Sequence, residues 1–297
     1  MLEITDLHKS FGDKKVLCGL NLSVPEHSIF GFIGGNGAGK TTTMKTVLGL
    51  IKADAGEIYV NGERVSYGQT ITNRFIGYLP DVPEFYPFMT AKEYLGFCGE
   101  ITGMSRAERD GRVAELLQLV GLDGEKHRIK GFSRGMKQRL GIAQALLNRP
   151  KLLICDEPTS ALDPIGRKEI LDVLLAARNE TTVLFSTHIL SDVERICTDV
   201  AFLKDGAVNM FGKLSDIKTG YRGNEYIVET ENSADISVLQ NAFSGLKEAD
   251  ANKMIFSEDK HAVGDVLRFI ADRRISLLKI ERLEPTLEDL FMEVTEK

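Results

Sequence analysis

The stretch Gly34-Gly35-Asn36-Gly37-Ala38-Gly39-Lys40-Thr41 decides how this chain folds. It satisfies the pattern G-x-x-x-x-G-K-[ST] of a phosphate-binding loop, in which glycines let successive backbone N–H groups turn toward one anion. In such a loop Lys40 reaches the β- and γ-phosphates of a nucleotide, and the Thr41 hydroxyl binds Mg²⁺. The alternative is a glycine-rich turn between a strand and a helix, with no ligand.

The segments on either side of this loop favour the phosphate-binding interpretation. Residues 28–33 form a short apolar run that is typical of a buried strand, and residues 42–50 carry apolar side chains at helical spacing. A helix that begins near Lys40 directs the positive end of its dipole toward bound phosphates. The sequence therefore predicts a strand, a phosphate-binding loop and a helix in an α/β fold.

Composition excludes several other classes of protein. A chain of 297 residues forms one or two domains, and a net charge of −6 argues against a nucleic-acid binder that works by bulk charge. The four cysteines, which are Cys18, Cys98, Cys155 and Cys197, are scattered, so we expect free thiols and no zinc site. No apolar run approaches the roughly 18 residues of a membrane span, and no signal segment is recognisable, which predicts a cytoplasmic protein.

Residues 1–30 alternate in the manner of strands, in two sets with a Gly12-Asp13 turn signal between them. Phe11 stands just before that turn and has two interpretations. It is either an aromatic plate for a nucleotide base or a residue packed on an edge strand, and exposed aromatics near turns are common. Two further strands follow, over residues 55–60 before an Asn-Gly turn and over residues 76–79, the latter ending at Pro80-Asp81.

Residues 83–131 change to a helical pattern, with helices predicted at 91–98 and 106–120. A helical insert between strands indicates a domain within a domain. Ser133 then precedes another helical run as an N-cap, and the Ser133-Arg134-Gly135 start of that helix can also bind an anion. The alternative is an ordinary capped helix.

Two acids end the apolar run Leu152–Cys155. Asp156, at the end of a buried strand downstream of a phosphate loop, is the expected second Mg²⁺ anchor, and Glu157 is placed to take a proton from an attacking water. The alternative for both acids is a solvated strand end. An amphipathic helix is predicted at 166–178. The next strand is predicted at residues 182–186 and is closed by Thr187-His188. His188 is a candidate for sensing the γ-phosphate, although a lone histidine is more often structural.

The C-terminal part restarts the pattern after a linker at residues 221–224. We predict strands at 226–230, 254–256 and 275–280, helices around 263–270 and 287–294, and capping-box spacing between Thr286 and Asp289. This part holds no cluster of catalytic residue types, so we expect a small α+β accessory domain at 221–297. The first domain is then 1–220, with its helical insert at about 83–150.

These motifs in this order resemble the ATP-binding subunit of an ABC transporter over roughly residues 1–215, and most closely the bacterial ABC-2 group. The resemblance implies an α/β, P-loop NTPase core of ABC type, with an antiparallel β subdomain, an inserted helical subdomain and a small C-terminal α+β domain. It implies that Phe11 stacks on adenine. It also implies that Gly34–Thr42, which includes Thr41, is the Walker A loop and that Asp156 is the Walker B acid. Glu157 corresponds to the catalytic base, residues 160–163 to the D-loop and His188 to the switch histidine.

Two positions depart from the family pattern. Residues 132–136 stand where the signature Leu-Ser-Gly-Gly-Gln belongs and keep Ser133 and Gly135, but have Arg134 and Met136. Asp81 stands where the family usually has a glutamine. An ionised carboxylate can ligate Mg²⁺ but cannot donate a hydrogen bond, so we expect Asp81 to serve as a metal ligand.

The resemblance also implies a mechanism. Each chain has one phosphate loop and one signature segment. Two chains would therefore close head to tail over two ATP molecules with Mg²⁺, either as a homodimer or as a dimer with a similar subunit. The ATPase would power transport, with export expected, through a separate ABC-2 membrane permease that holds it at the inner face of the cell membrane. No nucleic acid is expected as a partner. The alternatives are an ABC-type ATPase that acts on nucleic acid or ribosomes without a membrane partner, and a phosphotransferase.

Overall fold

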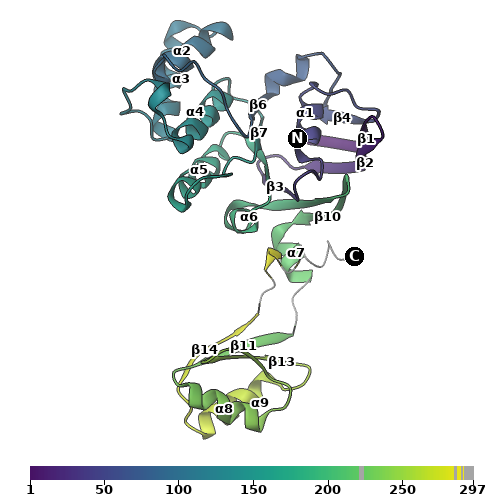
Figure 1. Cartoon of the computed structure of the whole chain (residues 1–297), viewed down its shortest axis with the longest axis vertical. Helices are drawn as coiled ribbons and strands as arrows, with labels where there is room; N and C mark the ends of the chain where they lie inside the picture. Colours follow the sequence, from purple (N-terminus) through teal and green to yellow (C-terminus); the bar gives the residue numbers. More distant parts are fainter. Residues whose placement is uncertain (221–223, 284–285, 289, 291–297) are drawn as a thin grey trace. The chain divides into compact units, whose positions relative to one another are not determined.

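The computed structural model describes residues 1–297 except 221–223, 284–285, 289 and 291–297 (Figure 1). The described chain divides into two compact units, with the division between Leu214 and Ser215. The described strands form two sheets in the first unit and one in the second, and each unit has its own core. They are therefore described separately.

The first sheet of the first unit is antiparallel and has the order β2-β1-β4-β5. Its strands are β1 (Leu2–Phe11), β2 (Lys14–Val24), β4 (Ala55–Val60) and β5 (Glu63–Arg64). The predicted Asn61-Gly62 turn is confirmed, because both residues have positive φ angles, 51° and 76°, as the tight turn of a hairpin requires. The predicted β1–β2 hairpin at residues 12–13 is also confirmed.

The second sheet has the order β10-β9-β3-β8-β7-β6. Its strands are β3 (Ile29–Gly34), β6 (Ile76–Leu79), β7 (Leu152–Asp156), β8 (Thr182–Thr187), β9 (Asp199–Lys204) and β10 (Ala207–Lys213). All neighbouring strands are parallel except β9 and β10. Strands β3, β7 and β8 are fully buried, which explains why their sequences are continuous apolar runs rather than alternating ones.

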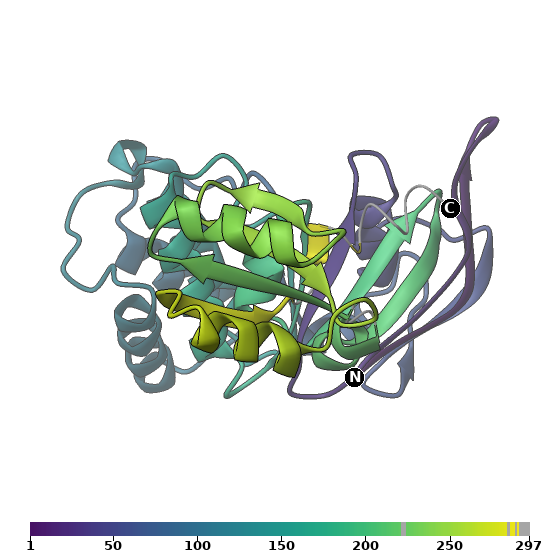
Figure 2. The same ribbon diagram turned by 90° about the horizontal axis from the view of Figure 1, so that it is seen from below.

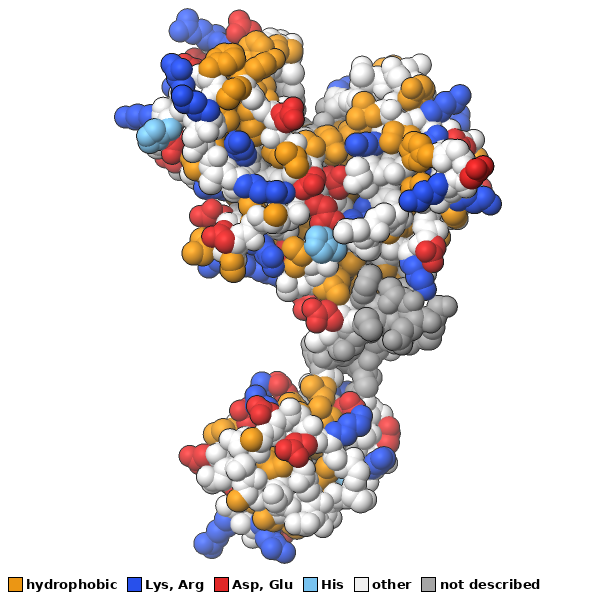
Figure 3. All heavy atoms as spheres, viewed as in Figure 1, with side chains coloured by type: hydrophobic (Ala, Val, Ile, Leu, Met, Phe, Trp, Pro, Cys, Tyr) orange, Lys and Arg blue, Asp and Glu red, His pale blue; other side chains and the backbone are white. Residues whose placement is uncertain are grey.

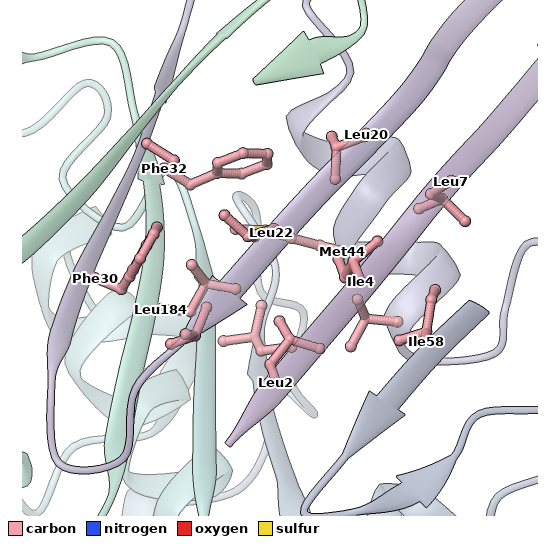
Figure 4. Packing of buried hydrophobic residues seen from close by; sticks show 14 of the residues in the cluster. Leu2, Ile4, Leu7, Leu20, Leu22, Phe30, Phe32, Met44, Ile58 and Leu184 are labelled. Carbon is pink, nitrogen blue, oxygen red and sulfur yellow. The ribbon is translucent and has the colours of Figure 1, made fainter. Parts of the chain in front are cut away.

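The main core lies between these two sheets and helix α1 (Lys40–Val47). Figure 4 shows side chains of the antiparallel sheet, such as Leu2 and Leu22, facing Phe30 and Phe32 of β3, with Met44 of α1 in the same cluster. Each of these side chains is almost completely buried. Burying a large apolar side chain contributes about 1.5–3 kcal/mol, so this cluster fixes the phosphate loop between β3 and α1.

The helical insert is made of α2 (Ala91–Ile101), α3 (Arg106–Leu119) and α4 (Arg134–Leu146). Short 3₁₀ turns lie at Ile71–Phe75 and Ile129–Gly131. Thr90 and Glu93 form a capping box that starts α2, and this helix continues to Ile101, beyond the predicted end at Cys98.

Two more helices follow in the first unit. Helix α5 (Pro164–Ala177) begins before the predicted start at residue 166, because Asp163 caps it and proline fits its first turn. Helix α6 (Leu190–Ile196) was not predicted.

The second unit has the order of elements β-α-β-β-α-β after α7 (Leu214–Gly220). Its elements are β11 (Glu225–Thr230), α8 (Ser233–Ala242), β12 (Lys247–Asp250), β13 (Lys253–Ser257), α9 (Val263–Asp272) and β14 (Leu277–Arg282). The antiparallel order β12-β13-β11-β14 is that of a ferredoxin-like α+β fold, with both helices on one face of the sheet (Figure 2). Strand β12 was missed because all four of its residues are exposed.

Some predictions for the C-terminal part concern residues outside the described ones. The linker predicted at 221–224 falls mostly on 221–223. The last predicted helix includes 291 and 294, and its capping box includes Asp289. These predictions stay predictions.

Candidate nucleotide-binding site

Sheet topology brings the predicted site residues to one edge. Strands β3, β7 and β8 are parallel neighbours, so their carboxyl ends meet at the same edge of the sheet. In this register Asp156 pairs with Ser186, and Ile33 pairs with Thr187. The phosphate loop after β3, the two acids at the end of β7 and His188 after β8 are therefore adjacent.

The loop from Gly34 to Gly39 has the backbone of an anion-binding nest. Gly37 and Gly39 have φ angles of 81° and 112°, which favour glycine. A Cβ atom on Gly39 would also lie 2.8 Å from Leu17 Cδ2. Gly39 is the N-cap of α1 and provides no side-chain acceptor, so the first N–H groups of the eight-residue α1 are left for a ligand.

Lys40 is the buried cation of the site, with 6% of its side chain exposed. Its Nζ donates to Gly34 O at 2.6 Å and lies 3.1 Å from Glu157 Oε1. A buried charge needs a partner, and here the carboxylate of Glu157 supplies it. Phosphate oxygens of a nucleotide would compete with Glu157 for this ammonium group.

Asp156 accepts two hydroxyl hydrogen bonds, from Thr41 Oγ1 at 2.8 Å and from Ser186 Oγ at 2.7 Å. A carboxylate beside a hydroxyl is the hard oxygen donor set that Mg²⁺ prefers. Among the described residues no three His, Cys, Asp or Glu side chains gather to hold a metal on their own. The donors fit Mg²⁺, which binds proteins through one or two carboxylates and takes its other ligands from phosphates and water.

Ser186 is a site residue that sequence reasoning missed. Its hydroxyl donates to Asp156 Oδ1 and accepts the backbone N–H of Glu157 at 3.0 Å. The side chain is fully buried. One hydroxyl thus positions both acids, and the available signal was the polar pair Ser186-Thr187 directly after the apolar run Val183–Phe185.

Glu157 lies between the two nitrogen-bearing side chains of the site. Its Oε1 faces Lys40, and its Oε2 is 2.8 Å from His188 Nδ1. The residue has a φ angle of 49°, an uncommon conformation for a residue with a side chain and one that recurs at functional sites. Only 15% of the Glu157 side chain is exposed, whereas His188 is half exposed and can reach a ligand.

A cavity of about 580 Å³ joins these groups, a size typical of small-molecule sites. Its lining consists of Phe11, Lys14, Val16, Gly35, Asn36, Gly37, Gly39, Lys40, Thr41, Thr42, Asp81, Glu157, Ser160 and His188. The ring of Phe11 is 51% exposed, and Lys9 Nζ lies 5.1 Å from its centroid. Two other predicted site residues lie behind this lining. Asp156 accepts a hydrogen bond from Thr41, and the carbonyl of Gly34 accepts one from Lys40.

Ser133 and Gly135 do not line this cavity. Ser133 caps α4, where its hydroxyl accepts the N–H of Met136 at 3.2 Å. Asp81 connects the two regions, because it lines the cavity and its carboxylate lies 3.4 Å from Arg134 Nη2. Within one chain Ser133 and Gly135 therefore lie outside the cavity that the phosphate loop lines, and Arg134 contacts that lining through Asp81.

Two groups beside the acids stay neutral. Burial, assisted by the negative charge of Asp156, raises the pKa of Tyr78 to about 12. The same two causes raise the pKa of the fully buried Cys155 thiol. Neither group supplies a charge or a nucleophile to the site at neutral pH.

Comparison with known proteins identifies the family. Residues 17–160 match the ABC transporter family model, and residues 212–295 match the C-terminal domain of DrrA1-3-like ATP-binding proteins. The chain is 36% identical to YxlF of Bacillus subtilis (strain 168), an uncharacterized ABC transporter ATP-binding protein, with 99% of each chain covered. It is also 36% identical to the bacitracin transport ATP-binding protein BcrA of Bacillus licheniformis, over 99% of this chain and 97% of BcrA.

Solved structures agree with the sequence relatives. The dimeric structure of MJ0796, a bacterial ABC transporter cassette, superposes with a TM-score of 0.64 at 27% identity and covers 72% of this chain and 99% of that one. Its post-hydrolysis dimer with ADP and Pi gives a TM-score of 0.62 at 26% identity, with the same coverage.

The chain belongs to the ABC transporter ATP-binding proteins and is an ATPase, which confirms the resemblance seen in its motifs. The expected fold class is confirmed as well.

Proposed function

We propose that this chain hydrolyses ATP with Mg²⁺ as a head-to-tail homodimer and powers export through a separate ABC-2 type membrane permease. In this proposal residues 1–220 are the ATPase domain and residues 221–297 are the accessory domain. The observation that carries the dimer is the separation of Ser133 and Gly135 from the cavity in which Lys40 and Glu157 lie. A second copy would supply that missing part, as the dimeric form of the related cassette supports.

Each side chain has a role that follows from its contacts. Lys40 and the loop amides hold the β- and γ-phosphates, with Phe11 against the base. Thr41, Asp156 and Asp81 hold Mg²⁺, which when bound neutralises charge on the phosphates.

The remaining groups act on the water and the γ-phosphate. Glu157 accepts the proton of the attacking water once Lys40 has turned to the phosphates, and His188 positions the γ-phosphate. Ser133 and Gly135 of the second copy close the site with the N-terminus of α4.

A surface on the helical insert suits the permease. Tyr86 and Phe88 are 48% and 60% exposed, and Phe97 and Ile101 of α2 add 36% and 68%. Hydrophobic side chains gather at this end of the molecule in Figure 3. An exposed apolar patch of this kind marks an interaction site. None of the helices in the described part of the chain has the length and apolar character of a membrane span.

Export is supported by relatives that are named for bacitracin transport and linearmycin resistance. Besides BcrA, the linearmycin resistance ATP-binding protein LnrL of Bacillus subtilis (strain 168) is 32% identical over 99% of this chain and 98% of its own length. The chain would then lie at the inner face of the cell membrane, bound to its permease.

The test of this proposal is the variant Glu157→Gln, which keeps the shape of the side chain but removes its basic oxygen. A general base contributes about 10²–10⁴-fold to a rate, so we expect kcat to fall by that factor while ATP still binds. The variant should elute as a dimer with ATP and Mg²⁺ and as a monomer without them. Lys40→Ala is the companion variant and should lose ATP binding in calorimetry. Hydrolysis by Glu157→Gln at the wild-type rate would show that Glu157 is not the base.

A further inference from the structure

The two departures from the family signature contact each other. Asp81 replaces the usual glutamine, Arg134 replaces the usual glycine, and Arg134 Nη2 lies 3.4 Å from Asp81 Oδ1. The side chain of Asp81 is 48% exposed and that of Arg134 is 44% exposed, so the ion pair is accessible to solvent and can be broken at small cost. This contact joins the nucleotide cavity to the first residue of α4.

The backbone of Asp81 is fastened to the same helix. The side chain of Gln138, which is fully buried, donates from Nε2 to Asp81 O at 2.6 Å. Further along α4, a Cβ atom on Gly141 would lie 2.5 Å from Leu79 Cδ1, so α4 and the end of β6 are packed as closely as a glycine allows. The Asp81 carboxylate can therefore turn while its backbone stays fixed to α4.

Asp81 lines two cavities. It lines the 580 Å³ cavity together with Thr41 and Glu157, and a second cavity of about 430 Å³ together with Arg134 and Lys137. A cation that arrives with the nucleotide and the guanidinium of Arg134 thus approach the same carboxylate from different sides.

We propose that Arg134 competes with the nucleotide-bound divalent cation for Asp81. In the structure Asp81 pairs with Arg134. When ATP and Mg²⁺ enter, Asp81 turns to the cation, and the Arg134 guanidinium is released at the N-terminus of α4. In the proposed dimer that end of α4 faces the ATP of the other copy, so loading of one loop prepares the signature segment that serves the second. The inference rests on the proposed function, because it takes Asp81 as a cation ligand.

The signs of the expected effects follow directly. Arg134→Gln removes the competitor, so Mg²⁺ should strengthen nucleotide binding more than it does in the wild type. A solvent-exposed ion pair of this kind corresponds to about a two- to fivefold change in an equilibrium constant. Asp81→Asn removes the shared ligand, so the strengthening by Mg²⁺ should shrink.

The experiment measures the Kd of a fluorescent, non-hydrolysable ATP analogue with the full-length chain, once with excess Mg²⁺ and once with EDTA. The readout is the ratio of the two Kd values, EDTA over Mg²⁺. We expect this ratio to rise about two- to fivefold in Arg134→Gln, to fall in Asp81→Asn, and to stay at the Asp81→Asn value in the double variant. Lys137→Gln is the matched control, because Lys137 lies on the same helix as Arg134 and lines the same 430 Å³ cavity. The Kd ratio of this variant should equal that of the wild type.

Two results distinguish a failure of this inference from a failure of the proposed function. If the wild-type ratio is one, the chain does not use a divalent cation and the proposed function itself is wrong. If the wild-type ratio exceeds one but Arg134→Gln leaves it unchanged, or raises it equally in the Asp81→Asn background, Arg134 does not act through Asp81. Either of these two results for Arg134→Gln would show that Arg134 does not compete with the cation for Asp81, and would leave the proposed ATPase function intact.

Discussion

Replacing Ser186 with alanine should disturb stability and turnover together, because one hydroxyl serves both acids. The variant removes a hydrogen bond to the Asp156 carboxylate and leaves the backbone N–H of Glu157 without its acceptor. A hydrogen bond to a charged group contributes about 1.5–3 kcal/mol, and an orphaned buried amide costs about 1–3 kcal/mol. Asp156 keeps its bond to Thr41, so we expect a total loss of about 3 kcal/mol.

Two assays measure the two consequences. A loss of about 3 kcal/mol in a domain of this size lowers Tm by roughly 6–12 °C in a thermal melt. In a steady-state ATPase assay kcat should fall about 10- to 100-fold with a smaller change in KM, because a base displaced by about 1 Å loses its alignment but the phosphate loop is untouched.

The matched control is Thr182→Val, at the other end of the same strand. Thr182 is also buried, and its Oγ1 accepts the backbone N–H of His27 at 2.9 Å. This variant should lose about 1 kcal/mol of stability and keep the wild-type kcat. The reasoning about Ser186 is refuted if Ser186→Ala melts within about 2 °C of the wild type, against the shift expected above, or if its kcat matches that of the control.

Two more predictions concern stability alone. Gly141→Ala should lower the free energy of unfolding by about 1–3 kcal/mol, since its new methyl group meets Leu79, whereas Gly111→Ala, which meets nothing within 4 Å, should raise it by up to about 1 kcal/mol. Urea titrations compare the two, and equal midpoints would contradict the packing argument. The side chain of Lys9 and the N–H of Ser10 hold the pKa of Asp54 below its ordinary value of 3.8. Its stabilising effect is therefore present above that value and lost as pH falls through the lowered pKa, so Asp54→Asn should be less stable than wild type at neutral pH, with the difference vanishing in acid. A difference that persists in acid would assign the effect to something other than the charge.

Much of the ATPase core could be predicted from local pattern. The apolar run before Gly34 and the helical spacing after Lys40 predicted β3 and α1, and Ser133 predicted the start of α4. These features depend on interactions within a few residues, such as capping bonds, backbone conformations that glycine allows, and the period of apolar side chains. The polar strand β12 has no such period, and only its pairing with β13 makes it a strand.

What the sequence by itself determined is the chemistry available at each position: a phosphate loop, two acids after one strand and a histidine after another. Only the tertiary structure decided which of these groups meet. The order of strands in the sheet places Ser186 between Asp156 and Glu157, and the packing of α4 on β6 brings Arg134 to Asp81. The physical reason is distance along the chain, because the Asp81–Arg134 contact spans 53 residues and is set by the burial of whole strands and helices rather than by any local preference.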